Sequence, residues 1–104
     1  MKTQSFLYQT IIERYNHEDY ANAKMIILEL FDNFGYDPEL GSPEIYFMLG
    51  NCFINEIQSM KDKAMLSEAI ASLEVYNLYN RLKYQFESII AKSLINECNY
   101  RLAH

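Results

Sequence analysis

Residues 37–76 decide the fold, and they read DPELGSPEIYFMLGNCFINEIQSMKDKAMLSEAIASLEVY. Ser42 followed by Pro43 is a strong helix start, because proline lacks only an amide that would be unpaired in the first turn. Apolar residues then recur at steps of three and four, which predicts a helix from Pro43 to about Ser59 and another after a cap at Asp62. The stretch is therefore expected to form an antiparallel helical hairpin.

Two small residues are expected to hold this hairpin together. A small residue on each helix lets the two helix axes approach closely and lets larger neighbours interlock around the crossing. Gly50 on the first helix and Ala69 on the second supply such a pair. The larger side chains around them are those of Tyr46, Leu49, Phe53, Leu73 and Tyr76.

This pattern resembles the tetratricopeptide repeat (TPR), a helical hairpin of about 34 residues that stacks on its neighbours. The first helix carries the family's aromatic-x-x-Leu-Gly-x-x-aromatic motif, and the second its Ala-x-x-x-apolar motif. The matching positions are Tyr46, Leu49, Gly50 and Phe53, then Ala69, Leu73 and Tyr76. An upstream unit around Tyr8 is similar, although Ile12 stands where the family prefers glycine. The resemblance implies an all-α, TPR-like stack of antiparallel helical hairpins whose usual role is to bind other proteins.

The same periodicity covers the rest of the chain and predicts about five helices in a single domain, residues 1–104. The first hairpin is expected over about 4–34, the second over about 43–80, and a C-terminal capping helix over about 82–102. In a repeat stack, such a terminal helix covers an apolar face that a further repeat would otherwise cover. A five-helix bundle without repeat ancestry is the alternative.

Local signals predict where the helices begin and end. Thr3 is a candidate N-cap of the first helix, and the Asp19 carboxylate is a candidate cap of the second. Gly35 is expected to adopt the left-handed conformation that ends a helix. A break after the fourth helix is expected within Asn77–Arg81.

The composition speaks against several classes of partner. With a net charge of −5 and no cluster of Lys or Arg, the chain is not expected to bind nucleic acid directly. No signal-peptide or membrane-spanning pattern is found, so no membrane contact and a cytoplasmic location are expected. The acidity is uneven, since eight carboxylates and one base, Lys24, lie between Glu18 and Glu56.

Residues suited to catalysis are few, and no enzyme is expected. His17 and His104 are the two side chains that titrate near neutral pH, and His17 is expected at the end of the first helix. Cys52 and Cys98 lie in helical runs and are interpreted as small buried apolar residues. The acidic loop that begins at Asp32 lacks the glycine that a calcium-binding loop needs. No catalytic residue, metal site or cofactor is therefore predicted.

The resemblance also implies that the first helix of each hairpin lines a shallow concave groove. Its expected partner-binding positions are Gln9, Glu13, Asn16 and His17 on the first helix, and Phe47, Asn51, Ile54 and Asn55 on the third. Asn51 and Asn55 are candidates to clamp a peptide backbone, since an amide group both donates and accepts hydrogen bonds. The alternative is that both are ordinary solvated positions.

Three tyrosines are not needed in the predicted core. Tyr36, Tyr84 and Tyr100 are candidate exposed contact residues, because a tyrosine ring buries a large area while its hydroxyl stays in water. An apolar edge of the last helix through Tyr84, Ile95 and Tyr100 would also allow a homodimer.

Together these observations favour a non-enzymatic adaptor or small chaperone that binds a helix or extended segment of another protein. The alternative is a small acidic inhibitor, which a mobile element could encode, that blocks a basic surface of a larger protein complex. Salt distinguishes the two hypotheses, because binding driven by surface charge weakens as ionic strength rises.

Overall fold

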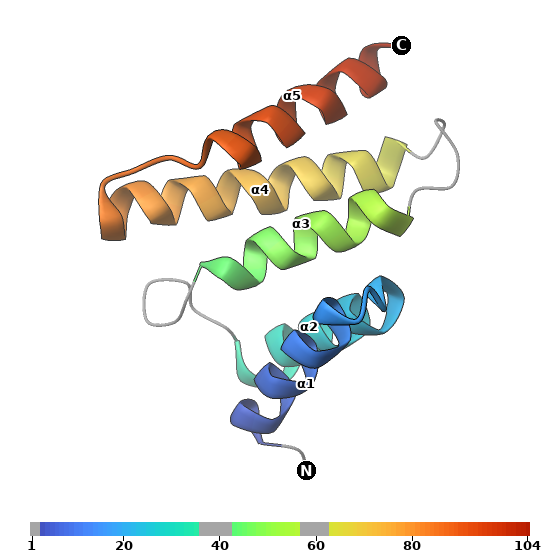
Figure 1. The fold of residues 1–104 in the computed structure, drawn as a ribbon, viewed down its shortest axis with the longest axis vertical. Coiled ribbons are helices and arrows are strands. Elements are labelled where there is room, and N and C mark those ends of the chain that lie inside the picture. The colour runs from blue at the N-terminus through green and yellow to red at the C-terminus, as the bar shows by residue number, and fades with distance from the viewer. Residues whose placement is uncertain (1–2, 36–42, 57–62) are drawn as a thin grey trace.

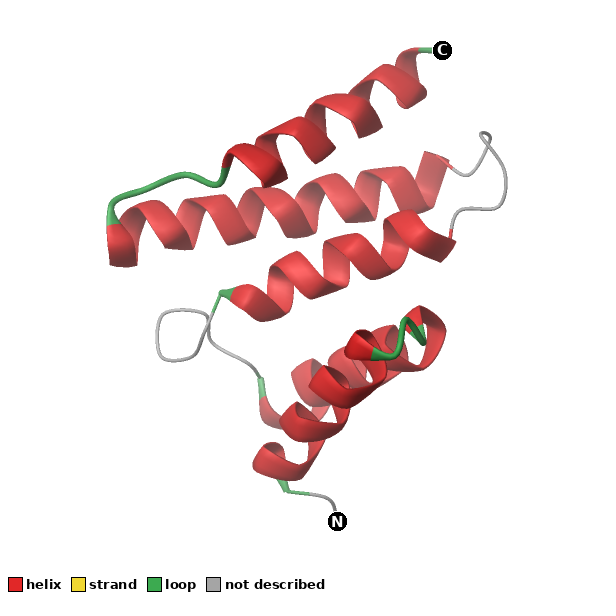
Figure 2. Cartoon of the chain, in the orientation of Figure 1, coloured by secondary structure: helices red, strands yellow, loops and turns green. Residues whose placement is uncertain are grey.

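Five α-helices make up most of the described residues, 3–35, 43–56 and 63–104 of this computed structural model, and no strand occurs among them (Figure 2). The helices are α1 (Gln4–Asn16), α2 (Tyr20–Phe34), α3 (Glu44–Glu56), α4 (Lys63–Tyr84) and α5 (Ile89–Ala103). The predicted all-α fold with about five helices is confirmed. Within these residues, none of the helices has the length and apolar character that crossing a membrane requires.

The helices follow one another in space as they do along the chain, each packed against the next (Figure 1). α1 and α2 lie at one end of the molecule, α5 lies at the other, and α4 lies between α3 and α5. The molecule measures 43 × 33 × 22 Å. Since a helix with its side chains is about 10 Å across, the short dimension holds only about two helices. Every helix therefore has a large share of its surface near solvent.

One apolar core joins the first three helices. Its buried residues recur at steps of three and four, so each helix contributes one stripe. They are Leu7 and Ile11 of α1, Ala23, Ile27 and Leu30 of α2, and Ile45, Leu49 and Cys52 of α3. Phe31 of α2 also stacks on Tyr46 of α3, with ring centroids 5.2 Å apart. These contacts hold one side of α3 to the α1–α2 pair.

The other side of α3 crosses α4 at a glycine. Gly50 is buried, and a Cβ atom at this position would lie 2.8 Å from Leu73 Cγ and 3.4 Å from the Ala69 carbonyl oxygen. The first distance is shorter than non-bonded carbons tolerate. Ala69 and Leu73 are themselves fully buried in α4. The predicted meeting of Gly50 with Ala69 is confirmed, and Leu73 fills the space that the missing side chain leaves.

Two of the predicted helix ends are confirmed and one cap is wrong. Thr3 Oγ1 accepts a hydrogen bond from the Phe6 amide at 3.1 Å, which caps α1. Gly35 ends α2 in the left-handed conformation, with φ +55° and ψ +55°. Asp19 precedes α2 but does not cap its backbone, because its carboxylate accepts instead from Asn22 Nδ2 at 2.8 Å.

The predicted break within Asn77–Arg81 is also wrong, since α4 continues without interruption to Tyr84. Asparagine is a poor helix former, but Asn77 and Asn80 are both buried on the inner face of α4, and burial outweighs local propensity. The helix ends where Gln85 adopts a φ of +58°. The left-handed residue at a helix end is usually glycine and sometimes asparagine. Glutamine gives no such signal, so this helix end could not be predicted from the sequence.

α5 consequently begins at Ile89, and not near residue 82 as expected. Its N-cap is Ser88, whose Oγ accepts a hydrogen bond from the Ala91 amide at 3.2 Å. Four predicted features lie outside the described residues: the Ser42 cap, the end of the third helix near Ser59, the Asp62 cap and the candidate contact residue Tyr36.

Replacing Gly50 with alanine is expected to lower the free energy of unfolding by about 1 kcal/mol. Overpacking against Leu73 costs roughly 1–3 kcal/mol, and the better helix propensity of alanine returns about 1 kcal/mol. In a Leu73→Ala background the added methyl group meets no obstacle, so Gly50→Ala should instead stabilise the protein. Urea unfolding of the unsubstituted protein, the two single variants and the double variant measures both effects. Trimethylamine N-oxide is added to all four samples to offset the stability lost through Leu73→Ala. The same sign in both backgrounds would contradict the crossing.

Candidate functional site

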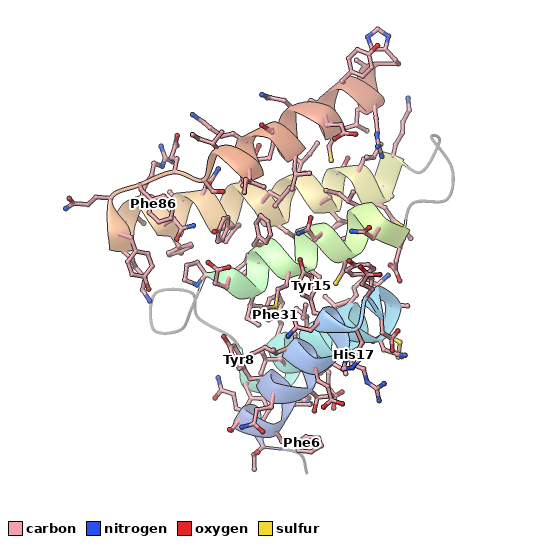
Figure 3. The ribbon with its side chains drawn as sticks, in the orientation of Figure 1. Phe6, Tyr8, Tyr15, His17, Phe31 and Phe86 are labelled. Carbon is pink, nitrogen blue, oxygen red and sulfur yellow. The ribbon has the colours of Figure 1, made fainter. Side chains whose placement is uncertain are left out.

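Asn51 and Asn55, two residues of the predicted groove, both form hydrogen bonds within the chain. Asn51 connects α3 to α1, and Asn55 bonds to the backbone of its own helix. Asn51 Nδ2 donates to the hydroxyl oxygen of Tyr15, which lies between the two helices, at 2.8 Å (Figure 3). Asn55 Nδ2 donates to the Asn51 carbonyl oxygen at 2.8 Å. Burial raises the pKa of Tyr15, so its hydroxyl stays protonated at neutral pH. Each side-chain amide thus already donates one hydrogen bond within the chain. The role of the two asparagines in clamping a partner's peptide backbone stays a prediction.

On α1, the predicted groove residues Gln9, Glu13, Asn16 and His17 are all exposed. His17 is the C-cap of α1, and its Nδ1 lies 2.7 Å from the Glu13 carbonyl oxygen. This is the helix-end position expected from the sequence. These exposed side chains are accessible to a partner, and their part in a groove stays a prediction.

The side chains of Phe47 and Ile54 pack largely between α3 and α4. The Phe47 ring lies 5.0 Å from the ring of Tyr76, centroid to centroid, and both Phe47 and Ile54 are half-buried. Ile54 packs against the two apolar clusters built on α4. Their role as the apolar floor of a partner groove stays a prediction, since much of their apolar surface is already covered by the chain itself.

Large exposed apolar side chains gather where α4 ends and α5 begins. Leu82 is 65% exposed, Tyr84 58%, Phe86 50%, Ile89 79% and Ile90 67%. We call these five residues the 82–90 apolar surface. Phe86 marks its position at the connection between the two helices (Figure 3). Single exposed apolar residues are ordinary, but five within nine consecutive positions make a dense run of exposed apolar side chains at one connection.

Of the predicted contact tyrosines, Tyr84 lies in this surface and Tyr100 lies elsewhere. Tyr100 is 64% exposed on α5, and its ring centroid lies 4.4 Å from that of His104. Both side chains are exposed as expected, and their part in contacts stays a prediction. The other four residues of the 82–90 apolar surface were missed. The available signal was the alternation of Leu82, Tyr84 and Phe86, which fits no single helical stripe.

A buried asparagine holds the connection that carries this surface. Asn77 Oδ1 accepts a hydrogen bond from the Ser88 amide at 2.9 Å, and Asn77 Nδ2 donates to the Ser88 carbonyl oxygen at 3.4 Å. Asn77 is 6% exposed, so losing either bond would leave a buried polar group unpaired. Residues 85–88 are thereby tied to the middle of α4.

Charged residues surround the same connection. The Glu87 carboxylate lies 2.8 Å from Lys92 Nζ and 3.3 Å from Arg81 Nε, so one anion serves two cations. The hydrogen bond from Lys92 and the positive charges of Lys92 and Arg81 lower the pKa of Glu87. Because Arg81 and Lys92 are exposed and Glu87 is only half-buried, these pairs fix charge positions more than they stabilise the fold.

Next to these charges lies a hollow of about 590 Å³ between α4 and α5. It is lined by Glu74, Asn77, Leu78, Arg81, Glu87, Lys92, Ile95 and Asn96. Its volume falls in the range of ligand sites, roughly 300–1,000 Å³, and its lining mixes apolar, amide and charged groups. The hollow was not predicted from the sequence. Its walls come from α4 and α5, and the boundary between these two helices was predicted too early in the chain.

A second hollow, of about 430 Å³, lies beside the turn between α1 and α2. It is lined by Glu18, Tyr20, Ala21, Lys24, Asn55, Glu56 and Met65. Within it, Lys24 forms an ion pair with Glu56, and Lys24 Nζ lies 5.3 Å from the centre of the Phe53 ring. Lys24 is thus engaged in joining α2 to α3.

Both cysteine thiols are buried, and their reactivity is expected to be low. Cys52 and Cys98 are free and are 0% and 2% exposed. Burial raises the pKa of Cys52 to about 12 and also raises the pKa of Cys98. Within the described residues, no three His, Cys, Asp or Glu side chains converge as a metal site would require.

Comparison with known proteins gives no match to a protein-family model, a curated protein or a solved structure. The geometry of the chain itself is therefore the basis for inferring its function.

Neither cysteine of the folded protein is expected to react appreciably with an aromatic disulfide reagent at pH 8. The thiolate is the reactive form, and a pKa of about 12 leaves on the order of 1 in 10,000 Cys52 side chains ionised at that pH. A Cys98→Ala variant isolates Cys52. In guanidinium chloride, both thiols of the unsubstituted protein should react at once. Fast labelling of Cys52 in the native variant would contradict its burial.

Proposed function

We propose that this chain is a non-enzymatic protein–protein interaction module, an adaptor or small chaperone, that holds a segment of a partner protein against the 82–90 apolar surface. The observation that carries the proposal is the exposure of its five large apolar side chains, which ranges from 50% to 79%. An exposed apolar group of this kind with a polar rim is typical of a surface that another protein covers.

The fixed frame around the surface supports the same proposal. A partner that binds a preformed surface avoids much of the entropy cost of ordering it. Here the two bonds from Asn77 to Ser88, the Ser88 cap on α5 and the Glu87 ion pairs all act on the connection between α4 and α5. The surface is therefore suited to recognise a partner without rearranging.

We also propose that the five helices form a TPR-like stack, with α5 as its terminal cap. The close crossing of Gly50 with Ala69 and Leu73, and the packing of each helix on the next, are consistent with this arrangement. The resemblance of residues 37–76 to a family that binds proteins favours the same class of function. On this proposal, the exposed residues Gln9, Glu13 and Asn55 form a separate polar contact row.

A second candidate function, an inhibitor of a basic surface, rests on the acidic half. In described residues 3–35 and 43–56 there are seven carboxylates and two bases. Both bases are already paired, Arg14 with Asp19 and Lys24 with Glu56. The remaining negative charge could be attracted to a cationic partner. Binding through it should weaken steeply with salt, whereas binding through the 82–90 apolar surface should tolerate salt.

A photo-crosslinking amino acid placed at Ile89 tests the first proposal. In cells that express the protein, position 89 is expected to give a discrete cross-linked partner, and Ile90→Asp should reduce the yield at least tenfold because a charge then lies in the buried contact. The matched control carries the crosslinker at Met25, which is 64% exposed on α2. Equal partner yields from both positions, or none from position 89, would contradict the proposal.

A further inference from the structure

From the lining of the hollow between α4 and α5 we infer a ligand site for a short peptide with free termini, a zwitterion of about three residues. The carboxylate of this peptide binds at the end of the hollow next to the α4–α5 connection, and its ammonium group binds at the opposite end. The site lies beside the 82–90 apolar surface, and the inference does not depend on the proposed function.

Two neighbouring helices form the walls of the hollow. One face of α4, from Glu74 to Arg81, lines it with residues at steps of three and four. The stretch of α5 from Lys92 to Asn96 supplies the opposite wall. After the connection, α5 runs back along α4 (Figure 1). Arg81 and Lys92 therefore lie at the end next to the connection, and Glu74 and Asn96 lie at the far end.

The end next to the connection carries an excess of one positive charge. Two cations, Arg81 and Lys92, share the single carboxylate of Glu87 there. The Arg81 side chain is 55% exposed, and it approaches Glu87 through Nε at 3.3 Å. A guanidinium has five N–H donors in a planar fork that matches a carboxylate. One further carboxylate can bind here and balance the charge of this end.

The far end carries one carboxylate that has no counter-charge. Glu74 is exposed and forms no ion pair or hydrogen bond with the residues that the structure describes. The side chain of Asn96, also exposed, lines the same end from α5. An ammonium group has three donors and no acceptor, so carboxylate and amide oxygens are suitable partners for it. A purely anionic ligand would be repelled at this end, and a purely cationic ligand at the other.

The spacing of the two ends determines the length of the ligand. Arg81 lies two turns after Glu74 on α4, which is about 10 Å along the helix axis. An extended peptide advances about 3.3–3.6 Å per residue, so about three residues separate its terminal charges by this distance. A peptide with unblocked termini carries both charges at pH 7. The volume of the hollow, about 590 Å³, can hold a molecule of this size.

Between the charged ends the hollow offers apolar contacts. Leu78 of α4, 41% exposed, and the half-buried Ile95 of α5 line this middle part. Successive side chains of an extended peptide point in opposite directions, so the middle side chain can face these two residues while its neighbours face water. An apolar middle residue is therefore favoured. Asn77, which also lines the hollow, is held in place by its two hydrogen bonds to Ser88.

Titration of the full-length, ¹⁵N-labelled protein with the tripeptide Ala-Leu-Ala at pH 7 tests the inference by NMR. The peptide is expected to bind saturably and to shift the side-chain amide signals of Asn77 and Asn96. Acetylation of its N-terminus or amidation of its C-terminus removes one charge, and each change should weaken binding at least fivefold.

Matched variants assign each end of the peptide to its side chain. Glu74→Gln should weaken binding of the free peptide at least fivefold and leave the affinity for the N-acetylated peptide unchanged. Arg81→Gln should act in the same way on the free and the C-amidated peptide. Glu68→Gln makes the same charge change as Glu74→Gln at an exposed α4 position outside the hollow, and it should alter neither affinity. Leu82→Ser, in the 82–90 apolar surface, should also alter neither. Circular dichroism checks that each variant is folded.

Several results would overturn the ligand site. No saturable binding, or equal affinity for the free peptide and for a peptide blocked at both ends, would exclude a zwitterion site. An equal loss of affinity for the free and the N-acetylated peptide in Glu74→Gln would contradict the placement of the ammonium group. Loss of binding in Leu82→Ser would place the peptide on the apolar surface instead. The position-89 crosslinks test the proposed function separately from all of these results.

Discussion

The close contact between Gly50 of α3 and Leu73 of α4 is the constraint on which the rest of the arrangement depends. A side chain at residue 50 would force the helices apart, because a Cβ atom there would lie 2.8 Å from Leu73 Cγ. α3 is also the helix that joins the α1–α2 core to the C-terminal half through Ile45, Leu49 and Cys52. Since the helices pack in chain order, a shift at this one crossing would displace everything beyond it.

The position of α4 in turn determines what the molecule displays. Asn77 faces inward because α4 is buried along that side, and from there it binds the Ser88 backbone and fixes the start of α5. The connection is short, and its apolar side chains have no helix to cover them. The same chain of contacts that orders the fold thus leaves Ile89 and Ile90 exposed beside Arg81 and Lys92. Exposure here is a consequence of packing geometry.

The sequence was informative where periodicity and caps act locally. The stripes of α1 to α3, the Thr3 cap, the left-handed Gly35 and the Gly50–Ala69 meeting all follow from short-range patterns. It was misleading where tertiary contacts outweigh propensity. Asn77 and Asn80 read as helix breakers but are buried, and Gln85 ends α4 without a glycine. Four of the five residues of the 82–90 apolar surface were missed as well, because their exposure depends on where α4 ends and the alternation of Leu82, Tyr84 and Phe86 was the only local sign of it.

Proton NMR of the native protein in solution tests the central contact most directly. One Hα of Gly50 must occupy the space next to Leu73 if the helices cross as described. The account predicts strong nuclear Overhauser effects between the Gly50 Hα protons and the Leu73 methyl groups. A Gly50 whose Hα protons show cross-peaks to water and none to α4 would contradict the crossing and the arrangement built on it.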